Sequence, residues 1–259
     1  MKKDLLKQTP IAFSRSRREL LGLIGASAAA SLAGDPGGPS AAAEPLRRLA
    51  QAATPSCVVR PEQTEGPYFV DDRLKRSDIR SDPSDGSVKP GVPLQLTFHV
   101  SRIDGRGCSP LGGAIVDIWQ CDALGVYSGV HDLNGRFDTR GKQFLRGYQV
   151  TEADGRVRFL TLYPGWYPGR TVHIHFKIRT DPAARRGHEF TSQLYFDDAI
   201  TDRAHAQAPY AEKGLRRVRN ARDGLFRKGG DQLVLRVAKD AQGYAGTFDI
   251  GLRLPGSAA

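Results

Sequence analysis

The amino-acid sequence predicts a mainly β protein, an antiparallel β-sandwich with short helices and long loops. Its 259 residues include 29 glycines and 16 prolines, which favour strands and turns over long helices. Apolar residues recur in short segments, several of them alternating with polar residues, and turn residues separate these segments. With 39% hydrophobic residues, a chain of this length can bury one full core.

The first predicted strands lie between residues 94 and 162. Residues 94–100 alternate apolar and polar side chains, as in a half-buried strand, and residues 114–119 form a more continuous apolar run. Residues 146–151 and 156–162 flank Asp154–Gly155, a dipeptide that favours a hairpin turn between two strands.

Four further strands are predicted in the C-terminal part, over residues 171–178, 191–196, 232–237 and 247–254. The last of them alternates cleanly, with four apolar residues on one face: Phe248, Ile250, Leu252 and Leu254. Between the second and third of these strands, residues 211–226 are expected to form a short basic helix. Its solvated face would carry Lys213, Arg216, Arg217 and Arg219.

The N-terminal region has the features of an export signal. Ser16–Arg17–Arg18–Glu19–Leu20–Leu21 precedes a short stretch rich in Ala, Gly and Leu, and Ala41–Ala42–Ala43 offers small residues for cleavage. We therefore expect residues 1–43 to be a signal peptide of the twin-arginine type, residues 44–56 a linker, and residues 57–259 the β-sandwich domain. The mature protein would be periplasmic or extracellular, with no stable membrane association. The alternative is an uncleaved membrane tether or a disordered tail.

Charge and cysteine content narrow the function classes. The formal net charge is +10, and removing a leader with six basic and three acidic residues leaves +7. The sequence shows no run of interleaved aromatic and basic residues beside this positive net charge, so we expect no nucleic-acid partner. Two of the three cysteines are expected to pair outside the cytoplasm, and the sequence does not choose among Cys57, Cys108 and Cys121. The third is expected to be a buried free thiol.

His173 and His175 are the main candidates for metal ligands. In an extended strand, side chains at positions i and i+2 point to the same face, so both imidazoles can reach one ion. Arg170 would place a fixed positive charge nearby. A tyrosine such as Tyr167 ligates well only as phenolate, and since the pKa of a free phenol is about 10, its ionisation needs a strongly polarising cation. Ferric iron fits this requirement.

Four motifs occur in order along the chain. They are Thr64–Glu65–Gly66–Pro67–Tyr68; Asp117–Ile118–Trp119–Gln120 with Gly125–Val126–Tyr127–Ser128; Pro164–Gly165–Trp166–Tyr167–Pro168–Gly169–Arg170–Thr171–Val172–His173–Ile174–His175–Phe176; and Ser192–Gln193–Leu194–Tyr195–Phe196. Together they resemble the intradiol ring-cleavage dioxygenases, the superfamily of catechol and protocatechuate dioxygenases. The resemblance covers residues 57–254, nearly all of the expected mature chain.

The resemblance implies one non-haem Fe(3+) per chain, held by two tyrosines and two histidines. By motif position these ligands are Tyr127, Tyr167, His173 and His175. Arg170 and Gln193 would line the substrate side and act in catalysis together with Tyr167. Tyr68 would form a wall of the substrate pocket.

Other tyrosines and histidines have simpler interpretations. Tyr163 lies four residues before Tyr167, but the Pro-Gly-x-Tyr register favours Tyr167 as the ligand. Tyr148 and Tyr195 lie in predicted strands and are interpreted as packing residues with hydrogen-bonded hydroxyls. The histidines without paired spacing are interpreted as surface residues or as residues behind the ligands: His99, His131, His188 and His205.

The family's activity would cleave a catechol-type ring with O2 between its two hydroxyl-bearing carbons, giving a cis,cis-muconate-type diacid. Tyr167 would leave the iron as substrate binds, and Arg170 would stabilise negative charge on the ring. The preferred catechol stays open. So does the oligomeric state, although no long helical segment precedes the sandwich to build a dimer in the way of larger catechol-specific members.

Two alternatives compete with this interpretation. The first is an enzyme that uses the histidine pair with another metal such as zinc, which needs no tyrosine and usually takes a third His, Cys or carboxylate. The second is a sandwich domain that binds phenolics or another protein. The intact set of tyrosines, histidines and arginine favours the dioxygenase.

Overall fold

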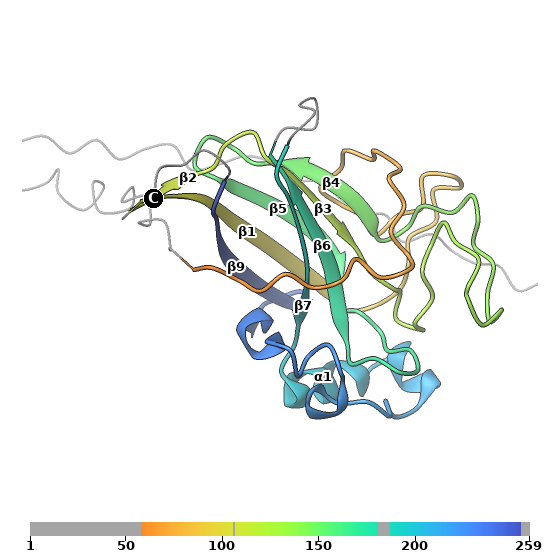
Figure 1. The fold of residues 1–259 in the computed structure, drawn as a ribbon. Helices are drawn as coiled ribbons and strands as arrows, with labels where there is room; N and C mark the ends of the chain where they lie inside the picture. The colour runs from red at the N-terminus through yellow and green to blue at the C-terminus, as the bar shows by residue number, and fades with distance from the viewer. Residues whose placement is uncertain (1–57, 106, 181–186, 255–259) are drawn as a thin grey trace, which may run out of the picture. The chain divides into compact units, whose positions relative to one another are not determined.

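Two β-sheets form the scaffold, which confirms the mainly β prediction (Figure 1). The computed structural model describes residues 58–105, 107–180 and 187–254. The first sheet contains β1 (Pro93–Asp104), β2 (Gly107–Pro110), β5 (Arg156–Leu162), β8 (Val237–Lys239) and β9 (Tyr244–Leu252). The second sheet contains β3 (Ile115–Trp119), β4 (Arg146–Val150), β6 (His173–Arg179) and β7 (Glu189–Tyr195). The predicted signal peptide and linker lie outside the described residues.

The core lies between these sheets and follows the predicted alternation. In β1, Leu94, Leu96, Phe98 and Val100 are buried, with mostly polar residues between them. In β9, Phe248, Ile250 and Leu252 are buried in the same cluster. Because strand side chains alternate between faces, each strand contributes one apolar row to the core.

Strand β6 presents different chemistry on its two faces. Ile174, Phe176 and Ile178 belong to the core cluster, so the residues between them face away from it. His173 and His175 therefore lie on the other side of the second sheet, as their i and i+2 spacing predicts. The pairing order β4-β3-β6-β7 places β6 inside that sheet, with a neighbour on each side.

The turn at Asp154–Gly155 forms, but the predicted hairpin is wrong. Gly155 has φ +75°, and its amide donates to the Glu152 carbonyl at 2.8 Å. The strands on either side belong to different sheets, because β4 pairs with β3 whereas β5 pairs with β1. A tight turn fixes the local direction of the chain and leaves open which sheet each strand joins. Among the described strands, β1 and β9 pair in parallel.

The predicted basic helix over residues 211–226 is wrong. This segment holds two 3-10 turns, η2 (Tyr210–Lys213) and η3 (Asn220–Arg222). Gly214 has φ +75° and ψ −171°, a conformation that ends a helix. Arg216 is not solvated either, because its side chain is 4% exposed and pairs with Asp198 at 2.6 Å.

The described residues contain one α-helix, α1 (Asp198–His205), which lies below the sheets in Figure 1 and was not predicted. Asp197 caps it by accepting hydrogen bonds from the amides of Ala199 and Ile200. The strand predicted over residues 232–237 is largely wrong. The 3-10 turn η4 (Gly230–Leu233) occupies its start, and β8 begins only at Val237. The buried pair Leu233 and Leu235 produced the alternating signal.

The cysteines that the structure describes fit the expectation of one disulfide and one thiol. Cys108 is disulfide-bonded, and Cys121 is free and buried. Cys57 lies outside the described residues. Among the described helices, none combines the length and apolar character needed to span a bilayer.

Candidate metal centre

His173 and His175 meet on the outer face of the second sheet. Their Nε2 atoms lie 3.0 Å apart, and each residue is 1% exposed. The strand register places His175 beside Trp119 of β3 and Gln193 of β7. The indole of Trp119 stacks on the His175 ring, with centroids 5.0 Å apart and planes 8° from parallel. The pair is therefore packed in position by both neighbouring strands.

A backbone carbonyl fixes the orientation of His173. Nδ1 of this ring lies 2.7 Å from the carbonyl oxygen of Thr171, which can only accept a hydrogen bond, so Nδ1 carries the proton. Nε2 then presents a lone pair, 3.1 Å from the hydroxyl of Tyr167. Burial, with the charge of Arg170, lowers the pKa of His173 well below 6.5. Burial also lowers the pKa of His175, so both rings are neutral at pH 7.

Tyr127 supplies an unsatisfied oxygen to the same centre. It follows β3 in the chain and is 1% exposed, and within the described residues its hydroxyl has no hydrogen-bond partner. Its ring centroid lies 5.7 Å from that of Tyr167 and 6.2 Å from that of His175. Buried hydroxyls nearly always have a partner, so an orphan here indicates a missing binding partner.

Burial raises the pKa of both phenols. The pKa of Tyr127 lies well above 10, and that of Tyr167 is raised as well, with burial the largest cause in each case. Without a strong nearby cation, both tyrosines stay protonated at neutral pH. Two neutral imidazoles and two phenols that ionise only beside such a cation fit a ferric ion. Among the described residues no group of three or more His, Cys, Asp and Glu side chains could hold a metal.

Arg170 is anchored beside these donors. Its Nη2 donates to Gln193 Oε1 at 2.6 Å and to the Tyr195 hydroxyl at 3.4 Å, and its Nε bonds Asp223 at 2.8 Å. The structure thus brings together Arg170 and Gln193, the two residues that the resemblance assigns to the substrate side. Tyr195 is buried and its hydroxyl is hydrogen-bonded, as the sequence interpretation expects, but its contact with Arg170 was not predicted. No local sequence signal marked Asp223.

Tyr68 covers the two tyrosines of the centre. Its ring centroid lies 4.6 Å from that of Tyr127 and 6.4 Å from that of Tyr167. Its hydroxyl donates to Asp132 Oδ1 at 2.5 Å, and Arg136 Nε bonds the other oxygen of Asp132 at 3.0 Å. Burial and this hydrogen bond raise the pKa of Tyr68 to about 12. Tyr68 is therefore a fixed, neutral aromatic wall.

Residues 63–72, here called the covering segment, lie over this face of the sheet. Gln193 Nε2 donates to the carbonyl of Thr64 at 3.0 Å. Lys177, of β6, is 5% exposed and bonds Glu65 at 2.5 Å, and its ammonium lies 4.4 Å from the ring centroid of Phe69. The first motif of the sequence therefore reaches the centre through a segment that is not a strand.

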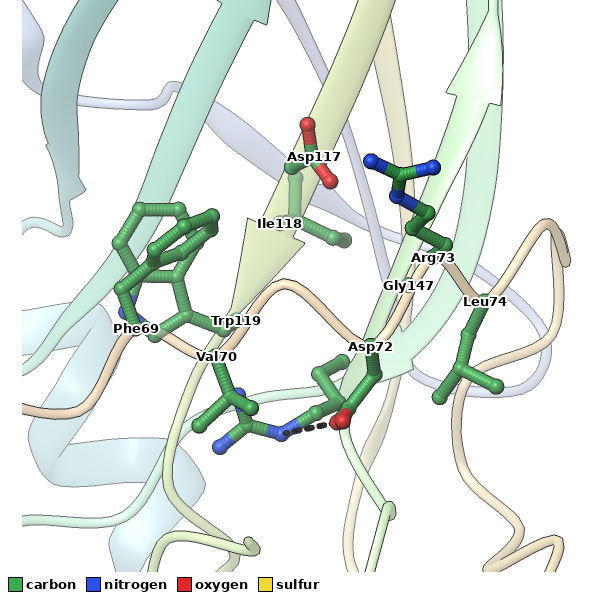
Figure 2. Close-up of a pocket in the computed structure, with 10 residues that line it drawn as sticks. Phe69, Val70, Asp72, Arg73, Leu74, Asp117, Ile118, Trp119 and Gly147 are labelled. Atoms are coloured by element: carbon green, nitrogen blue, oxygen red, sulfur yellow. Dashed lines mark ion pairs between the residues drawn. The ribbon is translucent and has the colours of Figure 1, made fainter. Parts of the chain in front are cut away.

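A pocket adjoins the centre without containing it. Figure 2 shows Phe69 and Trp119 on one side of this pocket and Arg73 and Leu74 on the other. The pocket shares Trp119 with the centre. None of the four candidate metal ligands, which are Tyr127, Tyr167, His173 and His175, lines it. We place the functional site at these four residues and not at the pocket. The unpaired Tyr127 hydroxyl and the facing rings of His173 and His175 are the groups that a metal ion would bind.

The remaining candidates lie elsewhere. Tyr163 bonds Thr201 at 2.8 Å inside the main core, away from the four donors. His99 pairs with Asp249, and His131 with Asp138, at the surface. His205 differs from a surface histidine, because it stacks on Tyr210 and its Nδ1 is buried without a partner among the described residues.

Comparisons with known proteins identify relatives of this chain. Residues 64–253 match the sequence model of a family described as Dioxygenase. The chain is 35% identical over 124 residues to the protocatechuate 3,4-dioxygenase beta chain of Burkholderia cepacia, covering 44% of this chain and 51% of that protein. It is 30% identical over 183 residues to catechol 1,2-dioxygenase 1 of Acinetobacter lwoffii, covering 59% and 54%. The chain thus spans about half the length of these curated relatives.

Solved structures show the same similarity. An intradiol ring-cleavage dioxygenase from Tetranychus urticae is 33% identical, with a TM-score of 0.63, over 76% of this chain and 95% of that one. The dioxygenase domain of a carbohydrate-binding fusion protein from Streptomyces sp. SirexAA-E is 34% identical, with a TM-score of 0.52, over 76% and 100%.

Proposed function

Because the chain belongs to the intradiol ring-cleavage dioxygenase family, we propose that it cleaves a catechol-type ring with O2 between the two hydroxyl-bearing carbons. The product would be a cis,cis-muconate-type diacid. The observation that carries the proposal is the donor set. Two neutral imidazoles and an orphaned phenol meet a second phenol on one face of a sheet.

We further propose that Tyr127, Tyr167, His173 and His175 hold one non-haem Fe(3+). Bound there, a ferric ion would supply Lewis-acid chemistry that activates a catechol-type ring. Neighbouring residues hold the two histidine rings in the orientation that metal binding requires. Thr171 holds the lone pair of His173 outward, and Trp119 fixes the plane of the His175 ring.

Tyr167 suits the role of proton acceptor at its Oη. It is only half-buried, whereas Tyr127 is fully buried, so the open side of the centre lies at Tyr167. A substrate that enters there meets Tyr167 before Tyr127. Arg170 would stabilise negative charge on the ring, with Gln193 holding the guanidinium, and Tyr68 would stack beside the substrate.

Zinc enzymes and non-catalytic binding domains account less well for these observations. A zinc site has no use for a buried phenol without a partner, and the described residues provide no third ligand of the usual type. A binding domain would not need the fixed lone pair of His173. The arginine held beside the donors is likewise a feature of a reacting site.

The test is oxygen uptake by the iron-loaded protein across catechol, protocatechuate, hydroxyquinol and chlorinated catechols. We expect one O2 consumed per substrate, and mass spectrometry should find both oxygen atoms in a ring-opened diacid. His175→Ala should abolish uptake. An iron-loaded wild-type protein that consumes no oxygen with any of these substrates, or that opens the ring at another bond, would falsify the proposal.

We also propose export by the twin-arginine route, supported by the motif around Arg17 and Arg18. The test is fractionation of cells that express the full chain. The protein should leave the cytoplasm, and the double variant R17K/R18K should remain inside. Equal export of both chains would contradict the route.

A further inference from the structure

Asp223 is a fully buried carboxylate whose two oxygens have separate partners. Its side chain is 0% exposed. Oδ1 accepts hydrogen bonds from the backbone amides of Leu225 at 2.8 Å and Phe226 at 3.0 Å. Oδ2 accepts from Arg170 Nε at 2.8 Å and from the amide of Thr171 at 2.8 Å. Oδ1 thus stabilises the local turn that follows Asp223. Oδ2 binds Thr171 and Arg170, which lie 52 and 53 positions earlier in the chain.

These contacts determine how Arg170 is presented. The guanidinium is planar, so anchoring Nε on Asp223 and Nη2 on Gln193 and Tyr195 fixes the whole group. Within the described residues Nη1 makes no hydrogen bond, and the side chain is 19% exposed. Nη1 is therefore the donor left available to a ligand.

The same oxygen of Asp223 acts on the histidine pair. It holds the amide of Thr171, and the carbonyl of Thr171 orients the ring of His173. Burial alone would raise the pKa of Asp223, but hydrogen bonds from the Phe226 and Thr171 amides, with Arg170, hold it below the usual range. The carboxylate is therefore ionised and balances the charge of Arg170.

We propose that Asp223 is the positioning residue of this centre: it holds Arg170 with Nη1 free for the substrate and sets the backbone that orients His173. The inference rests on the proposed dioxygenase function. Asp223 itself touches neither the four donors nor the substrate. Its effect on turnover would pass through Arg170 and Thr171.

Asp197 provides a matched control elsewhere in the chain. Its Oδ1 accepts from the amides two and three residues later, Ala199 at 2.8 Å and Ile200 at 3.0 Å, as Asp223 Oδ1 does. Its Oδ2 bonds no arginine within the described residues. Replacing either aspartate by asparagine keeps an oxygen for the two amides. Only at position 223 does this replacement remove the hydrogen-bond acceptor of an arginine, Arg170.

The experiment compares Asp223→Asn and Asp197→Asn in the full iron-loaded chain. We expect kcat/KM for the best catechol of the panel to fall about tenfold to a hundredfold in Asp223→Asn and to stay within about twofold in Asp197→Asn. Anaerobic binding of the same catechol should weaken only in Asp223→Asn. Equal behaviour of the two variants in turnover and in binding overturns the proposal, because both would then be simple turn caps.

One further measurement and one fallback variant keep the outcomes separable. The NMR signal of Arg170 Nε–H, assigned with Arg170→Lys, should show slow solvent exchange in wild type and fast exchange in Asp223→Asn. This exchange rate tests whether Asp223 positions Arg170, and it does so even if the wild-type protein turns over no catechol. Absence of turnover would contradict the proposed function but not the positioning role. Should Asp223→Asn not fold, Asp223→Ser keeps a short cap and serves in its place. Slow exchange in the folded variant counts against the inference.

Discussion

Gly66 lies directly against His175: a Cβ at position 66 would stand 3.2 Å from Cε1 of the imidazole. Gly66 also has φ +74°, in the left-handed region that favours glycine. The covering segment therefore approaches the candidate metal centre through glycine, the residue type that fits both the backbone conformation and the available space. Gly86 has nearly the same backbone, φ +73°, with nothing within 4 Å of a built Cβ.

This pair of glycines separates backbone strain from contact with the site. Gly66→Ala and Gly86→Ala should each lower the free energy of unfolding by about 1 kcal/mol, the cost of a left-handed alanine. Only Gly66→Ala should push the His175 ring and weaken iron retention against a chelator. Chemical denaturation and iron release rates measure the two effects. Equal iron retention in both variants would show that the contact is harmless.

Tyr127 and Tyr163 are both buried, but only Tyr163 has a hydrogen-bond partner in the described residues. Tyr127→Phe should stabilise the metal-free protein by about 1 kcal/mol, since it removes an unsatisfied buried hydroxyl. Tyr163→Phe should destabilise it by a similar amount and leave iron content unchanged. Iron analysis should find Tyr127→Phe depleted. Full iron in Tyr127→Phe would refute its assignment as a ligand.

Glu65 and Glu189 both bond Lys177 Nζ at 2.5 Å, yet only Glu65 belongs to the covering segment. Both carboxylates are partly exposed, so Glu65→Gln and Glu189→Gln should each cost less than about 1 kcal/mol of stability. Glu65→Gln should also accelerate iron loss, because it loosens the chain next to Gly66. Parallel melting curves and iron release assays compare the two. Matching release rates would argue against a role of the segment in retaining the metal.

Burial lowers the pKa of His205 below 6.5, and its Nδ1 lacks an acceptor among the described residues. The unfolded chain therefore binds a proton more readily than the folded one. The stability from neutral His205 is present above pH 6.5 and is lost as pH falls below that value, by up to about 1.4 kcal/mol per pH unit. His205→Gln should flatten this slope below pH 6.5. Urea unfolding at several pH values measures this pH dependence of stability. An unchanged slope in His205→Gln would show that His205 does not cause it.

Local signals in the sequence were sufficient for much of the site. The spacing of His173 and His175 placed both rings on one face, because strand side chains alternate regardless of context. The motifs around Tyr127, Tyr167 and Arg170 marked residues that the structure brings together. The same alternation identified the core faces of β1 and β9, since burial of one face leaves a period of two in the sequence.

Other features depended on contacts between distant residues. Arg170 meets Asp223 across 53 positions, and nothing near Asp223 in the sequence distinguishes it from an ordinary turn residue. The turn at Asp154–Gly155 was visible, yet only the packing of two sheets assigned its strands to different partners. The sequence by itself therefore determined the strand faces and the common face of His173 and His175, because both follow from local periodicity. The proposal of Tyr127 and Tyr167 as further ligands came from the motif resemblance. The tertiary structure alone decided strand pairing and the anchoring of Arg170, because those energies come from burial and hydrogen bonds that exist only once distant segments meet.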